Sequence, residues 1–123
     1  MIELKFEDRE TYLAVHFSGP TELGSLKDSI DRIWAASEKH NHKRVLCDLR
    51  QLPKPSGEAL RYEMGLHIAE VWSGRLKGAF LVASMANNHL TENAAVNRGA
   101  RVRFMDNEAA ALAWLLEETQ RRD

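Results

Sequence analysis

The stretch that decides the fold is "NAAVNRGARVRFMDNEAAALAWL", residues 93–115. It predicts the end of one helix, a short strand and the start of a second helix. Gly99 supplies a residue that adopts the left-handed conformation, which commonly ends a helix. In "RVRF", the apolar residues Val102 and Phe104 alternate with Arg101 and Arg103, as expected of a half-buried strand. This helix–strand–helix order is typical of an α/β protein.

The last helix of the chain is predicted from the residues that follow this strand. Asp106 is the expected N-cap, and Glu108 places negative charge in the first turn, where the helix dipole favours it. Apolar residues three and four positions apart predict the face that packs on the sheet. These residues are Ala109, Leu112, Ala113 and Leu116.

Towards the N-terminus, two segments show the period-two alternation of strands. "IELKF" (2–6) and "YLAVHF" (12–17) are separated by a short polar segment, which predicts an antiparallel hairpin. Residues 22–38 change to helical periodicity, with Thr21 and Ser25 as alternative N-cap residues.

Two nearly continuous apolar runs complete the pattern. "RVLCDL" (44–49) and "GAFLVAS" (78–84) are typical of strands buried on both faces of a parallel sheet. Helices are predicted over residues 57–72 and from about residue 89 to Arg98. The expected fold is therefore α/β, with the order ββαβαβαβα and a mostly parallel sheet that begins with an antiparallel hairpin. We expect residues 1–123 to form a single domain.

The composition excludes several classes of function. Apolar residues make up 44% of the chain and charged residues 28%, and the net charge of −1 gives no reason to expect a nucleic-acid partner. No apolar run is long enough to span a membrane, and the N-terminus does not resemble a signal peptide. With one cysteine, Cys47, the chain forms no internal disulfide, and we expect a cytoplasmic protein.

The whole pattern resembles the STAS domains, and more specifically the SpoIIAA-like group of small bacterial proteins. The resemblance rests on the initial hairpin, "RVLCDLR" (44–50), "ALRYEMGLHIAE" (59–70) and "NRGARVRFMDNEAAALAWL" (97–115). It implies a protein that acts by binding other proteins and not as an enzyme. In the anti-sigma-factor antagonists of this fold, a serine after the central strand is phosphorylated. Ser56 corresponds by general position, although a helix N-cap is the favoured role for it.

Polar residues follow the carboxyl ends of the predicted parallel strands, where ligands bind in open α/β sheets. We interpret this edge as a candidate site for a small anionic or lipid-like ligand. The alternative is that these groups pair with one another or are solvated. A hydrolase using His89 and Asp48 is the least favoured hypothesis, and we expect no catalytic residue and no cofactor. The candidate ligand-binding residues are Asp48, Arg50, Ser84, Asn87 and His89, with Asp106 nearby.

A second apolar stripe lies on the predicted helix over residues 57–72, opposite its inner face. A helix with two apolar sides is either buried twice or meets a partner. We therefore predict an interface with a protein partner or with a second copy of the chain, as a homodimer. The candidate interface residues are Tyr62, Leu66, Ala69, Trp72 and, on the last helix, Trp114.

The same helix carries Glu63, His67 and Glu70 at steps of four and three residues, a spacing that brings metal ligands together. Such spacing often occurs by chance, so we favour a solvated face and predict no metal site. Cys47, in the middle of a buried strand, is expected to act as a small apolar side chain and not as a nucleophile.

Overall fold

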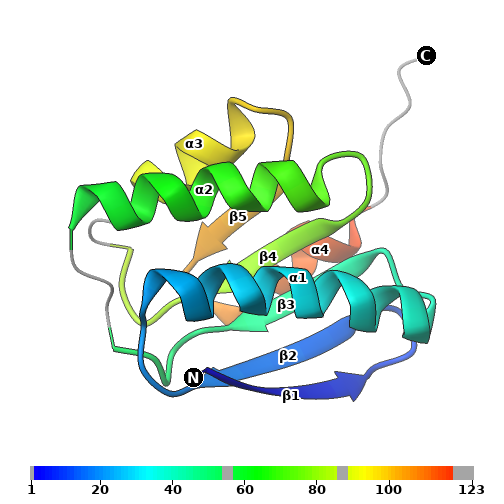
Figure 1. The fold of residues 1–123 in the computed structure, drawn as a ribbon. Helices are drawn as coiled ribbons and strands as arrows, with labels where there is room; N and C mark the ends of the chain where they lie inside the picture. The colour runs from blue at the N-terminus through cyan, green and yellow to red at the C-terminus, as the bar shows by residue number, and fades with distance from the viewer. Residues whose placement is uncertain (1, 54–56, 86–88, 118–123) are drawn as a thin grey trace.

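The computed structural model describes residues 2–53, 57–85 and 89–117, and Figure 1 shows how they are arranged. The order of strands and helices is ββαβαβαβα, as predicted. The strands are β1 (Glu3–Asp8), β2 (Leu13–Ser18), β3 (Arg44–Asp48), β4 (Lys77–Leu81) and β5 (Arg101–Met105). The helices are α1 (Leu23–His40), α2 (Glu58–Trp72), α3 (His89–Val96) and α4 (Glu108–Leu116).

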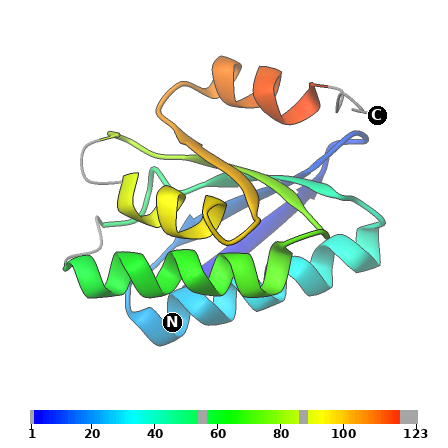
Figure 2. The same ribbon diagram turned by 90° about the horizontal axis from the view of Figure 1, so that it is seen from above.

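The five strands form one sheet in the order β1-β2-β3-β4-β5. β1 runs antiparallel to β2, and every other neighbouring pair is parallel. Seen from above, α1, α2 and α3 cover one face of the sheet and α4 covers the other (Figure 2). Hereafter these are called the α1–α3 side and the α4 side.

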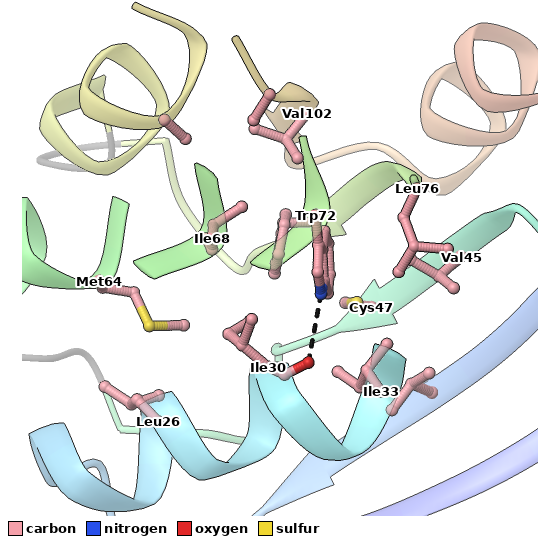
Figure 3. Packing of buried hydrophobic residues seen from close by; sticks show 14 of the residues in the cluster. Leu26, Ile30, Ile33, Val45, Cys47, Met64, Ile68, Trp72, Leu76 and Val102 are labelled. Carbon is pink, nitrogen blue, oxygen red and sulfur yellow. Dashed lines mark hydrogen bonds between the residues drawn. The ribbon is translucent and has the colours of Figure 1, made fainter. Parts of the chain in front are cut away.

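The main core lies on the α1–α3 side and is centred on Trp72 (Figure 3). Its indole nitrogen donates a hydrogen bond to the carbonyl of Ile30 at 3.2 Å, and its ring stacks on Phe80. The ring also lies directly over Gly78, where an added Cβ would approach it to 2.6 Å. Glycine at this position of β4 therefore makes room for the tryptophan.

Helix α2 is buried along two sides because it packs between α1 and α3. At Gly65 the approach of α3 is so close that a Cβ would lie 2.5 Å from the carbonyl oxygen of Thr91. Ala69, one residue of the second apolar stripe, is buried within the protein. For this residue, the second apolar side of the helix is therefore buried and does not face a partner.

Helix α4 differs from the prediction in its cap and in its buried face. Its N-cap is Asn107, whose side-chain oxygen accepts from the amide of Ala110 at 2.8 Å, and not Asp106. Its buried residues are Ala111 and Leu115, whereas two residues of the predicted stripe, Ala109 and Ala113, are exposed. The helix is apolar in almost every direction, so periodicity could not select the face that contacts the sheet.

Two other helix ends bear on the predictions. Gly99 has a φ of 101°, as expected of a residue that ends the α3 segment. Helix α1 begins after Glu22, whose side chain forms no cap hydrogen bond, so neither Thr21 nor Ser25 is its N-cap. None of the helices within residues 2–53, 57–85 and 89–117 is long and apolar enough to cross a membrane.

Candidate functional site

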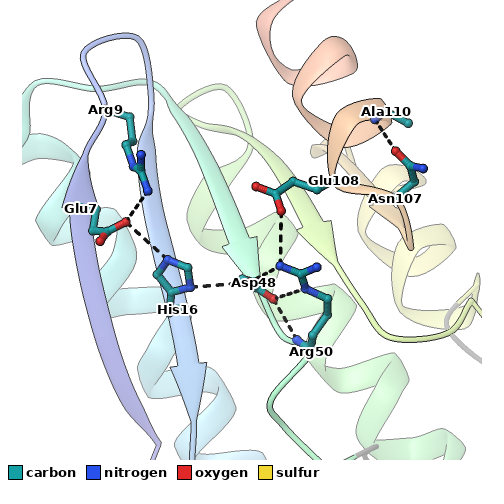
Figure 4. Close-up of polar contacts among 8 residues, drawn as sticks. All are labelled: Glu7, Arg9, His16, Asp48, Arg50, Asn107, Glu108 and Ala110. Carbon is teal, nitrogen blue, oxygen red and sulfur yellow. Dashed lines mark hydrogen bonds and ion pairs between the residues drawn. The ribbon is translucent and has the colours of Figure 1, made fainter.

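A chain of charged side chains crosses the α4 side from β1 to α4 (Figure 4). The carboxylate of Asp48 binds Arg50 through two hydrogen bonds, at 3.0 and 2.8 Å, and Arg50 also reaches Glu108 at 3.4 Å. His16 lies 3.5 Å from Asp48 on one side and 3.5 Å from Glu7 on the other. Side chains from β1, β2, the end of β3 and the start of α4 are therefore linked by close polar contacts.

Asp48 is the best shielded member of this cluster, with a side chain that is 13% exposed. The hydrogen bonds from the Arg50 guanidinium hold the pKa of Asp48 below its usual value, although burial opposes the shift. The pKa of Glu7 is lowered by its hydrogen bond from Arg9, at 2.7 Å. Both carboxylates are thus ionised and already paired near neutral pH.

An apolar cavity of about 190 Å³ lies on the α1–α3 side, beyond the carboxyl ends of β3 and β4. Arg61, Ser84 and Thr91 contribute polar groups to its wall. The position matches the place where open α/β sheets bind ligands. The apolar part of the lining includes Leu26, Leu49, Leu60, Met64, Val82 and Phe104.

The structure divides the predicted ligand-binding residues between the two sides of the sheet. Ser84 lines the cavity, whereas Asp48 and Arg50 pair with each other on the α4 side. His89 is exposed at the first residue of α3, and Asn87 lies outside the described residues. Asp106 is exposed immediately after β5. Asp48 shares the α4-facing side of β3 with Leu46, whereas Ser84 follows a different strand, β4.

Two of the five predicted interface residues are buried within the protein. Trp72 is fully buried and Ala69 is 5% exposed, so neither is available to a partner, and we remove both from the predicted interface. Tyr62 is 41% exposed, and Leu66 is half-buried one turn further along α2. Trp114 is half-buried on α4, with the Lys77 ammonium 4.5 Å from the centre of its ring.

Glu63 and His67, two of the three residues with metal-ligand spacing on α2, contact side chains of α1. His67 bonds Asp31 of α1 at 2.8 Å and lies 3.8 Å from Glu70, and Glu63 pairs with Lys27 of α1. Within the described part of the chain, no group of three or more potential ligands is arranged to hold a metal ion. Ser56, the position compared with the phosphorylated serine, lies outside the described residues.

Sequence reasoning missed the part that His16 plays in the charged cluster. The alternation of its strand puts His16 opposite the buried Val15 and Phe17, but the sequence did not show that Asp48 lies beside it. The parallel register pairs His16 with Asp48, and the antiparallel register pairs Glu7 with Ala14, near His16. Register was the missing signal, because it decides which polar residues of two strands become neighbours.

Comparison with known proteins adds information about the fold. No family model matches the chain, and no curated protein matches its sequence. Among solved structures, it is similar to an anti-sigma factor antagonist from Mycobacterium paratuberculosis, with a TM-score of 0.64 and 14% identity. That likeness covers 95% of this chain and 96% of the other. It is also similar to a protein with a SpoIIAA-like fold from Shewanella loihica PV-4, with a TM-score of 0.55, 17% identity and 93% of each chain covered.

The chain therefore has the SpoIIAA-like fold that its sequence pattern predicted. The order of strands, the antiparallel β1–β2 pair and the otherwise parallel sheet agree with this assignment. Fold alone does not determine activity, which has to be argued from the surfaces of this chain.

Proposed function

We propose that the protein is a non-enzymatic, cytoplasmic regulatory domain that acts by binding a protein partner. One solved structure with this fold is an anti-sigma factor antagonist, which supports a protein-binding role. The residues of the charged cluster do not line the apolar cavity, which agrees with a non-enzymatic role. An active acid or base would need to face a substrate.

The observation that carries the proposal is apolar exposure on α2 and α3. Among the described residues, Tyr62 and Val96 are the exposed large apolar side chains, at 41% and 45%. They lie on two helices that pack together, and half-buried Leu66 follows Tyr62 by one helical turn. Tyrosine is enriched among the residues that dominate protein interfaces. We call Tyr62, Leu66 and Val96 the α2–α3 surface.

The test begins with affinity capture by the tagged chain in an extract of its source organism. A captured protein counts only after the complex has been rebuilt from purified components and titrated. We expect Tyr62→Ala and Leu66→Glu to weaken this complex by about tenfold or more, which is the range of interface hot spots. Ala35→Glu, at an exposed position of α1, is the control and should bind as the wild type does.

Each variant must first give the wild-type circular dichroism spectrum, because half-buried Leu66 also contacts the protein itself. Equal affinity of the wild type and both folded variants for the rebuilt partner would overturn the α2–α3 surface as the binding site. Failure to rebuild any complex would overturn the protein-binding role.

The apolar cavity favours a second candidate function, the binding of a small amphiphilic molecule. A cavity of about 150 Å³ lined by apolar side chains is large enough to bind benzene. The cavity of about 190 Å³ therefore has room for a single ring or a short alkyl chain. Arg61 in its wall would favour an anionic head group.

Titration calorimetry with hexanoate and 1-hexanol tests this candidate and separates the head group from the chain. We expect both to bind, with hexanoate tighter, and Ala83→Leu to remove binding by filling the cavity from its exposed rim. Ala35→Leu adds the same bulk at an exposed position of α1 that is not in the cavity wall and should leave binding unchanged. No heat of binding with either compound would exclude this ligand class.

A further inference from the structure

The two edges of the sheet differ in how far they are protected against pairing with another strand. β1 and β5 are the edge strands. At β5, the carboxylate of Glu92 accepts a hydrogen bond from the backbone amide of Phe104 at 2.8 Å and so occupies an edge group. The exposed Arg101 and Arg103 would also face each other if two copies of β5 paired antiparallel about Val102. Both features oppose edge-to-edge association at β5.

The backbone groups of β1 that point outward follow from its register with β2. The amide of Arg9 donates to the carbonyl of Tyr12 at 2.9 Å, so this pair is hydrogen-bonded across the hairpin. Hydrogen-bonded and non-hydrogen-bonded pairs alternate along antiparallel strands. The amides and carbonyls of Leu4, Phe6 and Asp8 therefore point away from β2. At the start of the segment, Arg32 of α1 reaches the carbonyl of Ile2 at 3.2 Å.

The charges of β1 are complementary to those of a second β1 in an antiparallel arrangement. Acidic and basic residues alternate along one face, at Glu3, Lys5, Glu7 and Arg9, and Glu7 also pairs with Arg9 of its own chain at 2.7 Å. A two-fold axis through Phe6 places Lys5 opposite Glu7 of the other copy and Glu3 opposite Arg9. In this register, the backbone amides and carbonyls of Leu4, Phe6 and Asp8, which point away from β2, form the hydrogen bonds to the second copy.

Neighbouring registers that keep the same hydrogen-bonding groups are less favourable. A shift that centres the axis on Lys5 places the two lysines opposite each other and Glu3 opposite Glu7. A shift that centres it on Glu7 opposes the two glutamates. Like charges directly across a strand pair destabilise it, whereas opposite charges stabilise it. Pairing about Phe6 avoids these like-charge pairs and lets β1 pair along its full length.

We propose that β1 is a self-association surface, and that two copies of the chain join their sheets through antiparallel β1–β1 pairing about Phe6. The occupant of this edge is a second copy because the charge pattern of β1 complements itself. The contact is isologous, so both copies contribute the same residues and the dimer closes. This inference uses an edge of the sheet outside the α2–α3 surface and does not depend on the proposed function.

Two charge variants test the pairing by light scattering. Lys5→Glu leaves three acidic residues in a row on this face of β1, at positions 3, 5 and 7. Glu7→Lys leaves three basic residues in a row, at positions 5, 7 and 9. Each variant alone opposes like charges across the two-fold axis, so we expect each to have the 14.0 kDa mass of one chain. The wild type, and an equimolar mixture of the two variants, should have twice that mass, because the mixed pair restores opposite charges at both contacts.

The mixture separates interchain pairing from effects within a chain, because mixing changes only the partner. Arg103→Glu, on the opposite edge of the sheet, is the control and should remain dimeric. A wild type with the mass of a single chain at submillimolar concentration would overturn the proposal. So would folded variants that stay dimeric alone, or a mixture that stays monomeric. A variant that loses the native circular dichroism spectrum is replaced by Glu3→Lys or Arg9→Glu, which test the other charge pair in the same way.

Discussion

At the scale of single residues, Asp48 links a strand end to a loop and to a neighbouring strand. Its carboxylate accepts from the Arg50 backbone amide at 3.1 Å as well as from the Arg50 side chain, which fixes the first residues after β3. The charge of Asp48, and its place near the end of a buried strand, could be recognised from the sequence. Its pairing with His16 could not, because strand register depends on contacts distant in sequence.

This pairing predicts a pH dependence of stability. The folded-state pKa of Asp48 lies below its ordinary value of 3.8, so the carboxylate stabilises the fold at neutral pH. That contribution is lost as the pH falls through the lowered pKa. We expect Arg50→Met to reduce the free energy of unfolding by at most about 1 kcal/mol near neutral pH, since the pair is partly solvated.

Urea unfolding of the wild type and Arg50→Met at several pH values measures this difference. It should shrink as the pH is lowered below about 4, where Asp48 becomes protonated in the unfolded chain. Arg98→Met, an exposed arginine in the turn after α3, is the control. A difference that grows under acid conditions would show that Arg50 does not act through the ionised Asp48.

Cys47 gives a second prediction for a single residue. The thiol is fully buried in β3, and burial raises its pKa, so it stays protonated and unreactive in the folded protein. Iodoacetamide should label it only as fast as the protein unfolds, with a rate that increases with urea. Ser18→Cys provides an exposed thiol that should react at once. Rapid labelling of native Cys47 would contradict the buried position.

At the scale of whole elements, periodicity predicted the strands and helices because most of them bury one distinct face. Leu13, Val15 and Phe17 of β2 are buried, as their alternation indicated. The prediction was wrong for the buried face of α4, where the apolar pattern is uniform. Sequence does not show which neighbour covers an apolar stripe, so Ala69 and Trp72 were assigned to an interface.

The contact between α2 and α3 predicts the effect of Gly65→Ala. The added methyl group would meet the Thr91 carbonyl and the Ala94 side chain, at 2.5 and 2.6 Å, so α3 has to move as a unit. Overpacking of this kind typically costs about 1–3 kcal/mol. We expect a loss of that size in urea unfolding, together with faster hydrogen exchange in His89–Val96.

The matched control is Gly24→Ala near the start of α1, where an added Cβ would meet nothing within 4 Å. This substitution should leave stability unchanged or slightly raise it, because alanine favours the helix. If Gly65→Ala behaved as Gly24→Ala does, the close packing of α2 against α3 would be incorrect.

At the scale of the whole molecule, different surfaces are suited to different partners. The α1–α3 side contains the apolar cavity and displays the α2–α3 surface, whereas the α4 side carries a paired charge network. The sheet adds one edge with a self-complementary charge pattern, at β1. The predicted α/β fold, with its order of strands and helices along the chain and its antiparallel N-terminal hairpin, is confirmed. The binding roles of the predicted site residues and the single-domain organisation remain predictions.

The protein-binding role through the α2–α3 surface is tested most directly by amide NMR spectra of the labelled chain, recorded free and with its rebuilt partner. Each chain of 14.0 kDa gives one set of amide signals, whether it is single or part of a symmetric dimer, so the comparison runs residue by residue. We predict that the largest shift changes lie in α2 and α3, around Tyr62, Leu66 and Val96. Changes confined to β1 and α4, with α2 and α3 unaffected, would contradict the account.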